Sequence, residues 1–205
     1  MSLPTIVLFG GSFDPIHLGH TEVAKVAAEQ LHAERVIFLP AKRSPLKSNL
    51  PSAGDEDRIT MIRRAIENHP LFDVNDYELH RPAPSYTLHA VRHFRQVFGP
   101  ERSLYWLIGA DAAKDLLHWY GVRELMSLCH ISTMVRAGCS LPDFTGFADV
   151  MGEQHVAELN AHILQTPLIP ISSSEVRRRL STGESLETLL DPKVSDYIKN
   201  RGLYR

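Results

Sequence analysis

The sequence is poor in the features that mark secreted and membrane proteins. Its 205 residues include only two cysteines, Cys129 and Cys139, and no CxxC pair. So few cysteines argue against a disulfide framework and a zinc knuckle, and they predict reduced thiols in a cytoplasmic protein. No apolar run approaches the roughly 20 residues that a membrane-spanning helix needs. The N-terminal segment MSLPTIVLFG has no basic stretch, so we expect no secretory signal.

The chain also lacks an excess of charge of either sign. Its 22 Lys and Arg residues face 24 Asp and Glu residues, for a net charge of -2. Dedicated nucleic-acid binders are usually basic, so we expect no nucleic-acid partner, although a local basic cluster could hold a small phosphate ligand. The length predicts a single domain over residues 1–205 with a core that needs no disulfide or metal. A homo-oligomer is compatible with this composition.

Strand and helix patterns alternate along the chain. The apolar run 3–9 predicts a strand buried on both faces, and the spacing of Val23, Ala27 and Leu31 predicts a helix over 18–31. A basic loop is expected over 41–54, and 140–152 shows no clear pattern. Further helices are expected over 55–68, 86–98, 116–128, 153–164, 174–180 and 192–200. Further strands are expected over 35–40, 72–74, 75–80, 103–108, 130–135 and 167–171.

This alternation fixes the expected fold class. Strands that alternate with helices build right-handed βαβ units and a parallel sheet covered on both faces. We therefore predict an α/β protein with a Rossmann-like, doubly wound, mostly parallel sheet. The C-terminal third is richer in helix, which predicts a helical C-terminal extension of the same domain.

The first motif is GGSFDPIHLGH at positions 10–20, between the first strand and the first helix. Open α/β sheets bind ligands at the carboxyl ends of their strands, where this turn is expected. Gly10, Gly11 and Gly19 would let the backbone approach a ligand closely. The spacing is neither GxGxxG nor the GxxxxGK[ST] of a P-loop. Asp14 is expected to cap the helix or to orient the turn.

His17 and His20 add chemistry to this motif. Residues three apart at a helix start share one face, and the helix N-terminus favours anions. Two imidazole N–H donors there could hold phosphate oxygens. A metal site would need further ligands at a recognisable spacing, which the sequence does not show. A purely structural capping role for both histidines is the other alternative.

The second motif is ISSSEVRRRL at positions 171–180, which also opens a helix. Ser172, Ser173 and Ser174 offer hydroxyl and backbone N–H groups, with Ser174 as the expected N-cap. Arg177 faces back over the first turn and can bind phosphate with two N–H groups. The next two arginines, 178–179, are expected to be solvated surface charges.

Taken together, the two motifs resemble the nucleotidyltransferase superfamily. The intervening segments SYTL (85–88), LYWLIGAD (104–111), Trp119-Tyr120, VRAG (135–138) and YIKNRGLY (197–204) are similar to those of bacterial nicotinate mononucleotide adenylyltransferases. The resemblance covers nearly the whole chain in the right order. Two features depart from the family pattern: His89 stands where Asp is frequent, and the loop after the second strand lacks PPHK.

The resemblance implies a reaction that joins ATP and nicotinate mononucleotide into deamido-NAD and pyrophosphate, with Mg²⁺ carried by ATP and no metal ligands of its own. It implies catalytic roles for His17, His20, Lys47 and Arg177, with Lys42 and Arg43 as further candidates for the triphosphate cation. The implied ATP-binding residues are Gly10, Gly11, Ser12, Phe13, Gly109, Asp111, Ser172, Ser173 and Ser174. The implied mononucleotide-binding residues are Ser85, Tyr86, Thr87 and Trp119.

Several alternatives stay open at this point. The chain could transfer a nucleotide to phosphopantetheine or glycerol phosphate, or it could be a non-catalytic nucleotide-binding module. Asp111 is either a helix N-cap or a ligand of a ribose or of a water on the metal. Trp119 stacks on the pyridine ring or belongs to the core. Ser85 is the expected N-cap of the helix over 86–98, whose first N–H groups would then face the nicotinate carboxylate.

Overall fold

A parallel sheet forms the centre of the molecule. The computed structural model describes residues 3–135, 140–167 and 169–205. Within these residues, six strands lie in the order β3-β2-β1-β4-β5-β6, and all their pairings are parallel. The strands are β1 (Thr5–Gly11), β2 (Ala33–Pro40), β3 (Phe72–Val74), β4 (Ser103–Gly109), β5 (His130–Val135) and β6 (Ile163–Gln165). This doubly wound order confirms the predicted fold class. The chain adds β2 and β3 on one side of β1 and then β4, β5 and β6 on the other side, so the strand order reverses between β1 and β4.

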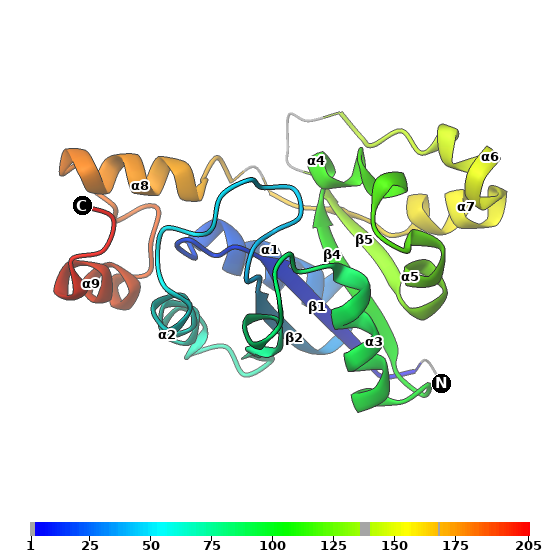
Figure 1. Ribbon diagram of the computed structural model, residues 1–205, viewed down its shortest axis with the longest axis horizontal. Helices are drawn as coiled ribbons and strands as arrows, with labels where there is room; N and C mark the ends of the chain where they lie inside the picture. Colours follow the sequence, from blue (N-terminus) through cyan, green and yellow to red (C-terminus); the bar gives the residue numbers. More distant parts are fainter. Residues whose placement is uncertain (1–2, 136–139, 168) are drawn as a thin grey trace.

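Helices cover both faces of the sheet (Figure 1). They are α1 (Leu18–Gln30), α2 (Asp55–Ile66), α3 (Thr87–Phe98), α4 (Ala110–Ala113), α5 (Val122–Leu128), α6 (Ala148–Met151), α7 (Glu153–Ala161), α8 (Ser173–Thr182) and α9 (Pro192–Arg201). Three short 3₁₀ helices span Tyr77–His80, Leu116–His118 and Thr145–Phe147. Residues 41–54 join β2 to α2 without helix or strand, as the composition of that loop predicts.

The core has two halves, one on each face of the sheet. Val7 and Phe9 of β1 pack with α1 and α2, whereas Ile6 and Leu8 pack with α3 and α5. Successive strand residues point to opposite faces, so a continuous apolar strand supplies both halves. This is why the first apolar run of the sequence could be identified as a buried strand.

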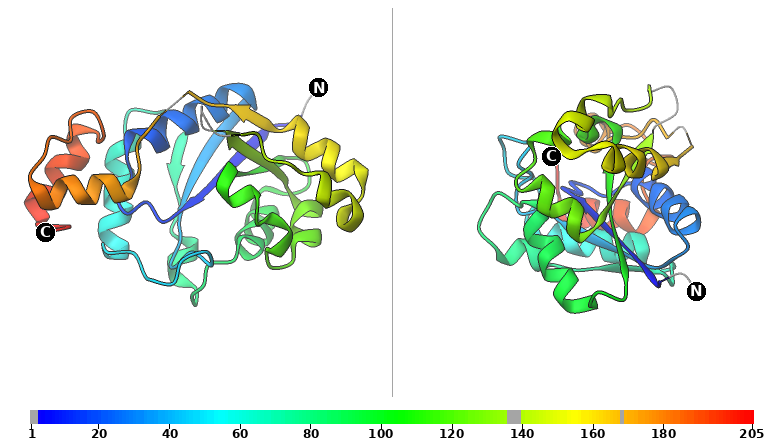
Figure 2. Two further views of the ribbon diagram at one scale, coloured as in Figure 1. Left: turned by 90° about the horizontal axis from the view of Figure 1, so that it is seen from above. Right: turned by 90° about the vertical axis from the view of Figure 1, so that its right-hand side faces the viewer.

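The predicted helical C-terminal extension is present. Helices α8 and α9 lie beyond α2 at one end of the molecule, and α6 and α7 lie at the other end (Figures 1 and 2). Leu190, Val194 and Ile198 join the core half that contains α1 and α2. The extension is therefore packed onto the sheet layer through apolar side chains.

Two stretches differ from the sequence-based expectation. Residues 75–80 do not form a strand, because the Asn75 side chain accepts the Tyr77 N–H at 2.9 Å and turns the chain into the 3₁₀ helix Tyr77–His80. The expected helix over 153–164 ends at Ala161, and the last strand is Ile163–Gln165 instead of 167–171. Prolines 167 and 170 have no N–H to donate to a ladder, which disfavours a strand there.

Cys129 is the C-cap residue of α5, its thiol is buried, and burial raises the pKa of the thiol, which disfavours the thiolate. Cys139 and the last three residues of the VRAG segment lie outside the described residues. Among the helices that the structure describes, none has the length and apolar character needed to cross a membrane.

Gly10 is required by close packing at the end of β1. A Cβ atom built on Gly10 would overlap the indole ring of Trp106, a buried side chain on β4. We expect Gly10→Ala to lower the free energy of unfolding by about 1–3 kcal/mol, the usual cost of overpacking a rigid core. Gly146→Ala is the matched control, because a Cβ atom added to Gly146 would have no neighbour within 4 Å. Equal denaturant midpoints for the two variants would contradict this packing argument.

Candidate active site

A cavity of about 610 Å³ opens at the carboxyl ends of β1 and β4, where the strand order reverses. Ligands bind at this point in doubly wound sheets. A smaller cavity of about 70 Å³ shares Phe9 and Gly109 with it and contains His17, Gly19 and His20 in its wall. The predicted residues on the wall of the larger cavity are Gly10, Gly11, Ser12, Lys47, Ser85, Tyr86, Thr87, Gly109, Asp111 and Trp119.

The glycines of the first motif serve the protein's own packing as well as the cavity. A Cβ on Gly11 would lie 2.9 Å from the Phe13 ring, and one on Gly19 would lie 3.0 Å from the His17 ring. Phe13 has a φ of 45° and is 1% exposed, so its side chain belongs to the core and is absent from both cavity walls. The predicted contact between Phe13 and ATP therefore stays a prediction.

His17 and His20 stack on each other at the start of α1. Their ring centroids are 3.6 Å apart with an interplanar angle of 21°. The His20 Nδ1 atom accepts a hydrogen bond from the His17 backbone N–H at 3.2 Å. An acceptor Nδ1 places the proton of a neutral imidazole on Nε2. The capping alternative and the phosphate-donor prediction are thus compatible, because capping occupies one nitrogen of His20.

Asp14 orients the turn and does not cap α1, although the sequence favoured capping. Its carboxylate is 5% exposed and accepts the backbone N–H groups of Ser52 and Ala53 at 2.7 and 3.0 Å. It also accepts the Tyr204 hydroxyl at 2.8 Å. Burial and the Asp14 charge raise the pKa of Tyr204, so the phenol keeps the proton that it donates. One carboxylate thereby joins the motif, the basic loop and the C-terminal segment.

The second motif contacts the first one directly. The Ser173 hydroxyl donates to the Pro15 carbonyl at 3.0 Å, and the Arg177 guanidinium donates to the Asp14 carbonyl at 2.6 Å. The N-cap of α8 is Ser172, whose hydroxyl accepts the Glu175 N–H at 3.2 Å, and not Ser174 as expected. Ser174 instead accepts from Arg177 at 3.3 Å. The serines and Arg177 flank the turn without being on the wall of either cavity.

The cations of the loop after β2 have different partners. Lys47 donates to the Ser12 hydroxyl at 3.1 Å on the wall of the large cavity. Lys42 forms an ion pair with Asp55, which also accepts from the fully buried Arg58 at 2.8 Å. Burial alone would raise the pKa of Asp55, but the bonds from Lys42 and Arg58 lower it overall. Lys42 is therefore compensated by a carboxylate, whereas Lys47 faces the cavity.

Arg43 contributes mainly through its backbone and a weak surface contact. Its carbonyl accepts the Ser85 N–H at 2.9 Å, and its guanidinium lies 3.5 Å from the Ser48 carbonyl. Arg43 consequently ties the basic loop to the start of α3, and its charge lies away from the large cavity wall.

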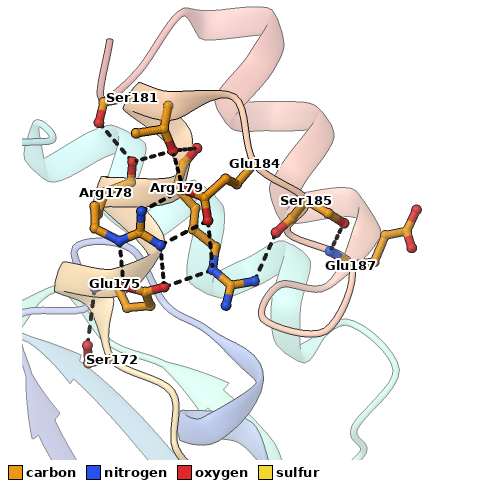
Figure 3. A network of polar contacts seen from close by, with 9 residues as sticks. Ser172, Glu175, Arg178, Arg179, Ser181, Glu184, Ser185 and Glu187 are labelled. Carbon is orange, nitrogen blue, oxygen red and sulfur yellow. Dashed lines mark hydrogen bonds and ion pairs between the residues drawn. The ribbon is translucent and has the colours of Figure 1, made fainter.

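The two arginines that follow Arg177 lie in a separate surface network (Figure 3). Arg178 bonds to Glu175 and Glu184, and Arg179 bonds to Glu175 and to the Ser185 carbonyl. These bonds hold the pKa of both glutamates well below the ordinary value, at about 2. As the sequence predicts, this charge stays on the surface, and Arg177 is the arginine of the three that faces the turn.

Ser85 has a different role from the expected N-cap. Tyr86 is the N-cap residue of α3, and the helix begins at Thr87. The Ser85 hydroxyl accepts the Lys42 N–H at 2.9 Å and hydrogen-bonds the Glu78 carboxyl group, so it is not available to cap. Glu78 is 5% exposed and lies on the wall of the large cavity, a position for which the sequence carries no signal.

Aromatic side chains form the outer wall of the cavity. Tyr86 and Tyr120 lie there with their rings 4.9 Å apart, and His89, which lines a neighbouring cavity, packs against both rings. Trp119 is half-buried beside them, and its indole N–H has no hydrogen-bond partner in the described structure. It also packs partly against the core, as one alternative for Trp119 expects, and stacking on a pyridine ring stays a prediction.

Asp111 is not a helix N-cap. Gly109 occupies that position of the short helix α4, and Asp111 lies inside the helix with its side chain 84% exposed. Because the carboxylate is on the cavity wall, it remains available to a polar ligand group.

Comparisons with known proteins identify similar sequences. A family model described as cytidylyltransferase-like matches residues 8–179. A probable nicotinate-nucleotide adenylyltransferase of Rhodopirellula baltica is 36% identical over 98% of this chain and 93% of that protein. A second protein of that name, from Opitutus terrae, is 38% identical over 98% of this chain and 97% of its own length.

Solved structures support the fold. The nicotinic acid mononucleotide adenylyltransferase of Plasmodium falciparum complexed with NaAD has a TM-score of 0.75 at 21% identity, with 98% of this chain and 97% of that chain covered. The same protein complexed with APC has a TM-score of 0.73 at 20% identity, covering 98% of this chain and 97% of that chain. At this identity the likeness concerns the arrangement of strands and helices.

Glu78 makes stability depend on pH. Burial raises its pKa from 4.5 to about 7, against the opposing effect of the Ser85 bond. The folded protein thus holds a proton that the unfolded chain releases, and stability falls as pH rises from 4.5 to 7. Glutamine is a neutral isostere of glutamate, so Glu78→Gln should remove this fall in stability with rising pH. We expect the free energy of unfolding of the variant, relative to wild type, to grow by on the order of 3 kcal/mol across that window.

Denaturant titrations at a series of pH values measure this difference. The exposed Glu29 offers a matched control, because Glu29→Gln makes the same chemical change outside the cavity. A Glu78→Gln difference that stays constant between pH 4.5 and 7 would mean that Glu78 binds its proton equally well in the folded and unfolded states, and would contradict the raised pKa.

Proposed function

Because the chain belongs to the cytidylyltransferase-like nucleotidyltransferases, and within them to the nicotinate-nucleotide adenylyltransferases, we infer that its cavity carries out adenylyl transfer. The reaction joins ATP and nicotinate mononucleotide to give deamido-NAD and pyrophosphate, a step of NAD biosynthesis.

The observation that carries the residue assignment is the convergence of two distant motifs on one turn. Ser173 bonds to Pro15 and Arg177 bonds to Asp14, across more than 150 residues of chain. Both motifs start a helix, and the N-terminus of a helix favours phosphate oxygens. Two helix N-termini beside one cavity form a site suited to a polyphosphate.

The chemistry needs positioning and charge stabilisation more than a nucleophilic side chain. The 5′-phosphate of the mononucleotide attacks the α-phosphorus of ATP in line, one P–O bond forms, and the bond to the β-phosphate oxygen breaks. The electron pair of that bond leaves with pyrophosphate. In such transfers the protein orients the reactants and stabilises charge on the phosphate oxygens.

The catalytic residues follow from where charge develops. The Nε2 donors of His17 and His20 are proposed to bind the α- and β-phosphate oxygens. Lys47 is proposed to contact the triphosphate from the basic loop, since its ammonium already reaches Ser12 across the cavity wall. Arg177 is proposed to bind the departing β- and γ-phosphates from the side of α8.

The adenylate end is proposed to bind along the turn and β4. Backbone groups of Gly10, Gly11 and Phe13 and the hydroxyl of Ser12 lie at the end of β1, with Gly109 across from them at the end of β4. The remaining proposed ATP-binding residues are Asp111, for a ribose hydroxyl, and Ser172, Ser173 and Ser174, for phosphate oxygens.

Mg²⁺ is proposed to arrive with ATP. The chain fits this role, because the Asp14 carboxylate beside the turn is already occupied by Ser52, Ala53 and Tyr204, whereas Asp111 is exposed on the wall and could hold a water of the ion's shell. When it is bound to the triphosphate, the ion would neutralise part of the charge on the phosphate oxygens.

The acceptor is proposed to lie between α3 and Trp119. Tyr86 and Thr87 place the N-terminus of α3 on the cavity wall, where it can bind the nicotinate carboxylate, and Trp119 can stack on the pyridine ring. Glu78 retains its proton up to a pH of about 7, so this wall adds little negative charge against the carboxylate. Ser85 completes the wall by holding Glu78.

The proposal includes two small-molecule substrates and a cytoplasmic location, with neither nucleic acid nor a membrane as a partner. The homo-oligomer that the sequence allows stays a prediction, as does the single-domain organisation.

Pyrophosphate release with a panel of acceptors tests the substrate assignment. We expect release from ATP with nicotinate mononucleotide and none with phosphopantetheine or glycerol phosphate. Charge-assisted bonds at the α3 N-terminus are worth about 1.5–3 kcal/mol each, so kcat/KM should favour the acid over nicotinamide mononucleotide by at least about tenfold. Equal values for acid and amide would remove the α3 N-terminus from recognition, and turnover with phosphopantetheine alone would overturn the substrate.

His20→Ala tests the phosphate-donor role. Loss of one preorganised donor to developing charge typically costs about 10²–10³ in kcat, and we expect a loss of that size. His155→Ala on α7 is the control, because His155 lies outside both cavities. A kcat for His20→Ala within about threefold of wild type, with an unchanged melting temperature, would show that the histidine pair only shapes the helix start.

A further inference from the structure

A cluster of two histidines and a glutamate lies at the opposite edge of the sheet from the active site. His130 is the first residue of β5, whereas the cavity opens at the carboxyl ends of the strands. Glu158 belongs to α7, and His162 directly follows that helix. One potential ligand atom from each of these three side chains lies within 4.8 Å of the other two.

Local structure explains why the three side chains meet. Glu158 and His162 are four residues apart, which places them on one side of the last turn of α7. The His162 carbonyl accepts the Thr133 N–H at 3.0 Å, and Ile163 pairs with Thr133 in the sheet. These backbone bonds fix the end of α7 beside the start of β5.

Aromatic packing holds the two imidazoles in place. Tyr105 on β4 pairs with His130, and their ring centroids are 4.8 Å apart. The His162 ring meets the Tyr105 ring edge-on at 5.1 Å and lies 5.2 Å from the His130 ring. Both imidazoles are thus oriented by a neighbour that is not itself part of the cluster.

The polar groups of the cluster are only partly satisfied. His130 Nδ1 hydrogen-bonds Glu158 Oε1, but the buried His162 Nδ1 has no hydrogen-bond partner in the described structure. A buried polar atom without a partner costs free energy that a bound ion could offset. The side chains of His130 and Glu158 are 40% and 28% exposed, so solvent can reach the cluster.

We propose that His130, Glu158 and His162 form a binding site for a divalent transition-metal ion of the zinc class. Two neutral imidazoles and one carboxylate are a known zinc ligand set, and imidazole ligands favour such ions over Mg²⁺. Ligand atoms around one zinc ion lie about 3.4 Å apart, so side-chain shifts of about 1 Å suffice. If the ion binds His130 through Nδ1, it takes the place of the hydrogen between His130 Nδ1 and Glu158 Oε1, and the neutral imidazole then carries its one proton on Nε2.

The proposed site would join α7 to the sheet. Helices α6 and α7 lie at the end of the molecule away from α8 and α9, and they connect β5 to β6 (Figures 1 and 2). An ion held by β5 and by the end of α7 would stabilise this segment through mass action. Its role is structural and independent of the adenylyl transfer proposed above.

Zinc titration of the metal-free protein tests the site. Protein dialysed against EDTA and then against metal-free buffer is titrated with Zn²⁺ in the presence of a chromophoric chelator. We expect about one ion per chain, a higher melting temperature with Zn²⁺, and at least about tenfold weaker binding for His162→Ala and for Glu158→Gln. His155→Gln on the same helix is the matched control and should bind like wild type.

Three results would overturn the proposal. In the first, wild type does not compete with the chelator for Zn²⁺. In the second, His162→Ala and Glu158→Gln bind Zn²⁺ as tightly as His155→Gln, which would place the zinc elsewhere. Melting curves in EDTA establish that the variants are folded, and Glu158→Gln keeps the shape of the side chain if His162→Ala does not fold. With Co²⁺ as a probe, wild type should give the intense visible bands of tetrahedral coordination, and a spectrum like that of the aqueous ion is the third result.

Discussion

The buried carboxylate of Asp14 is the contact on which the arrangement of the active site depends. It accepts hydrogen bonds from Ser52, Ala53 and Tyr204, and the carbonyl of the same residue accepts from Arg177. Segments that are far apart in the sequence are thereby held on one turn. A charged acceptor makes stronger bonds than a neutral one, and removing it would leave the buried N–H of Ala53 and the part-buried N–H of Ser52 without this partner. Asp14 therefore positions the phosphate-binding groups without needing to contact a phosphate.

Charge compensation sorts the basic residues around this turn into two groups. Arg58 and Lys42 share Asp55, and Arg178 and Arg179 share Glu175 and its neighbour Glu184. An arginine or lysine already paired with a carboxylate attracts a further anion only weakly. Lys47 has a hydroxyl partner, and Arg177 lies 3.7 Å from a carboxylate that has other donors. Lys47 and Arg177 are thus less fully compensated than the paired cations of the two clusters.

Much of the fold and the position of the site could be predicted from local pattern. Short apolar runs indicated the strands, and parallel strands end at one edge, so Gly10 and Gly109 had to lie near each other. The sequence could not reveal partners that only the fold brings together. The sequence left two roles open for Asp14, capping a helix or orienting the turn, and it could not decide between them because the partners at 52, 53 and 204 are distant in the chain. Ser85 was misassigned for the same reason, since its hydroxyl is used by Lys42 and Glu78.

The acceptor end of the cavity shows how burial can set specificity. A fully ionised glutamate beside the N-terminus of α3 would oppose a carboxylate ligand, since like charges at short range repel. Burial instead favours the neutral form of Glu78, with its pKa near 7, and an incoming carboxylate would favour that form further. The proton on Glu78 and the anion on the ligand are therefore thermodynamically linked: each stabilises the other. Preference for the acid over the amide should then weaken as pH rises above 7, because the ionised wall repels only the acid. The test is the ratio of kcat/KM for the two mononucleotides, measured against pH in wild type and in Glu78→Gln. Linkage through Glu78 predicts a ratio that falls with pH in wild type and stays flat in Glu78→Gln. A fixed contribution of the helix N-terminus would leave the ratio flat in both proteins.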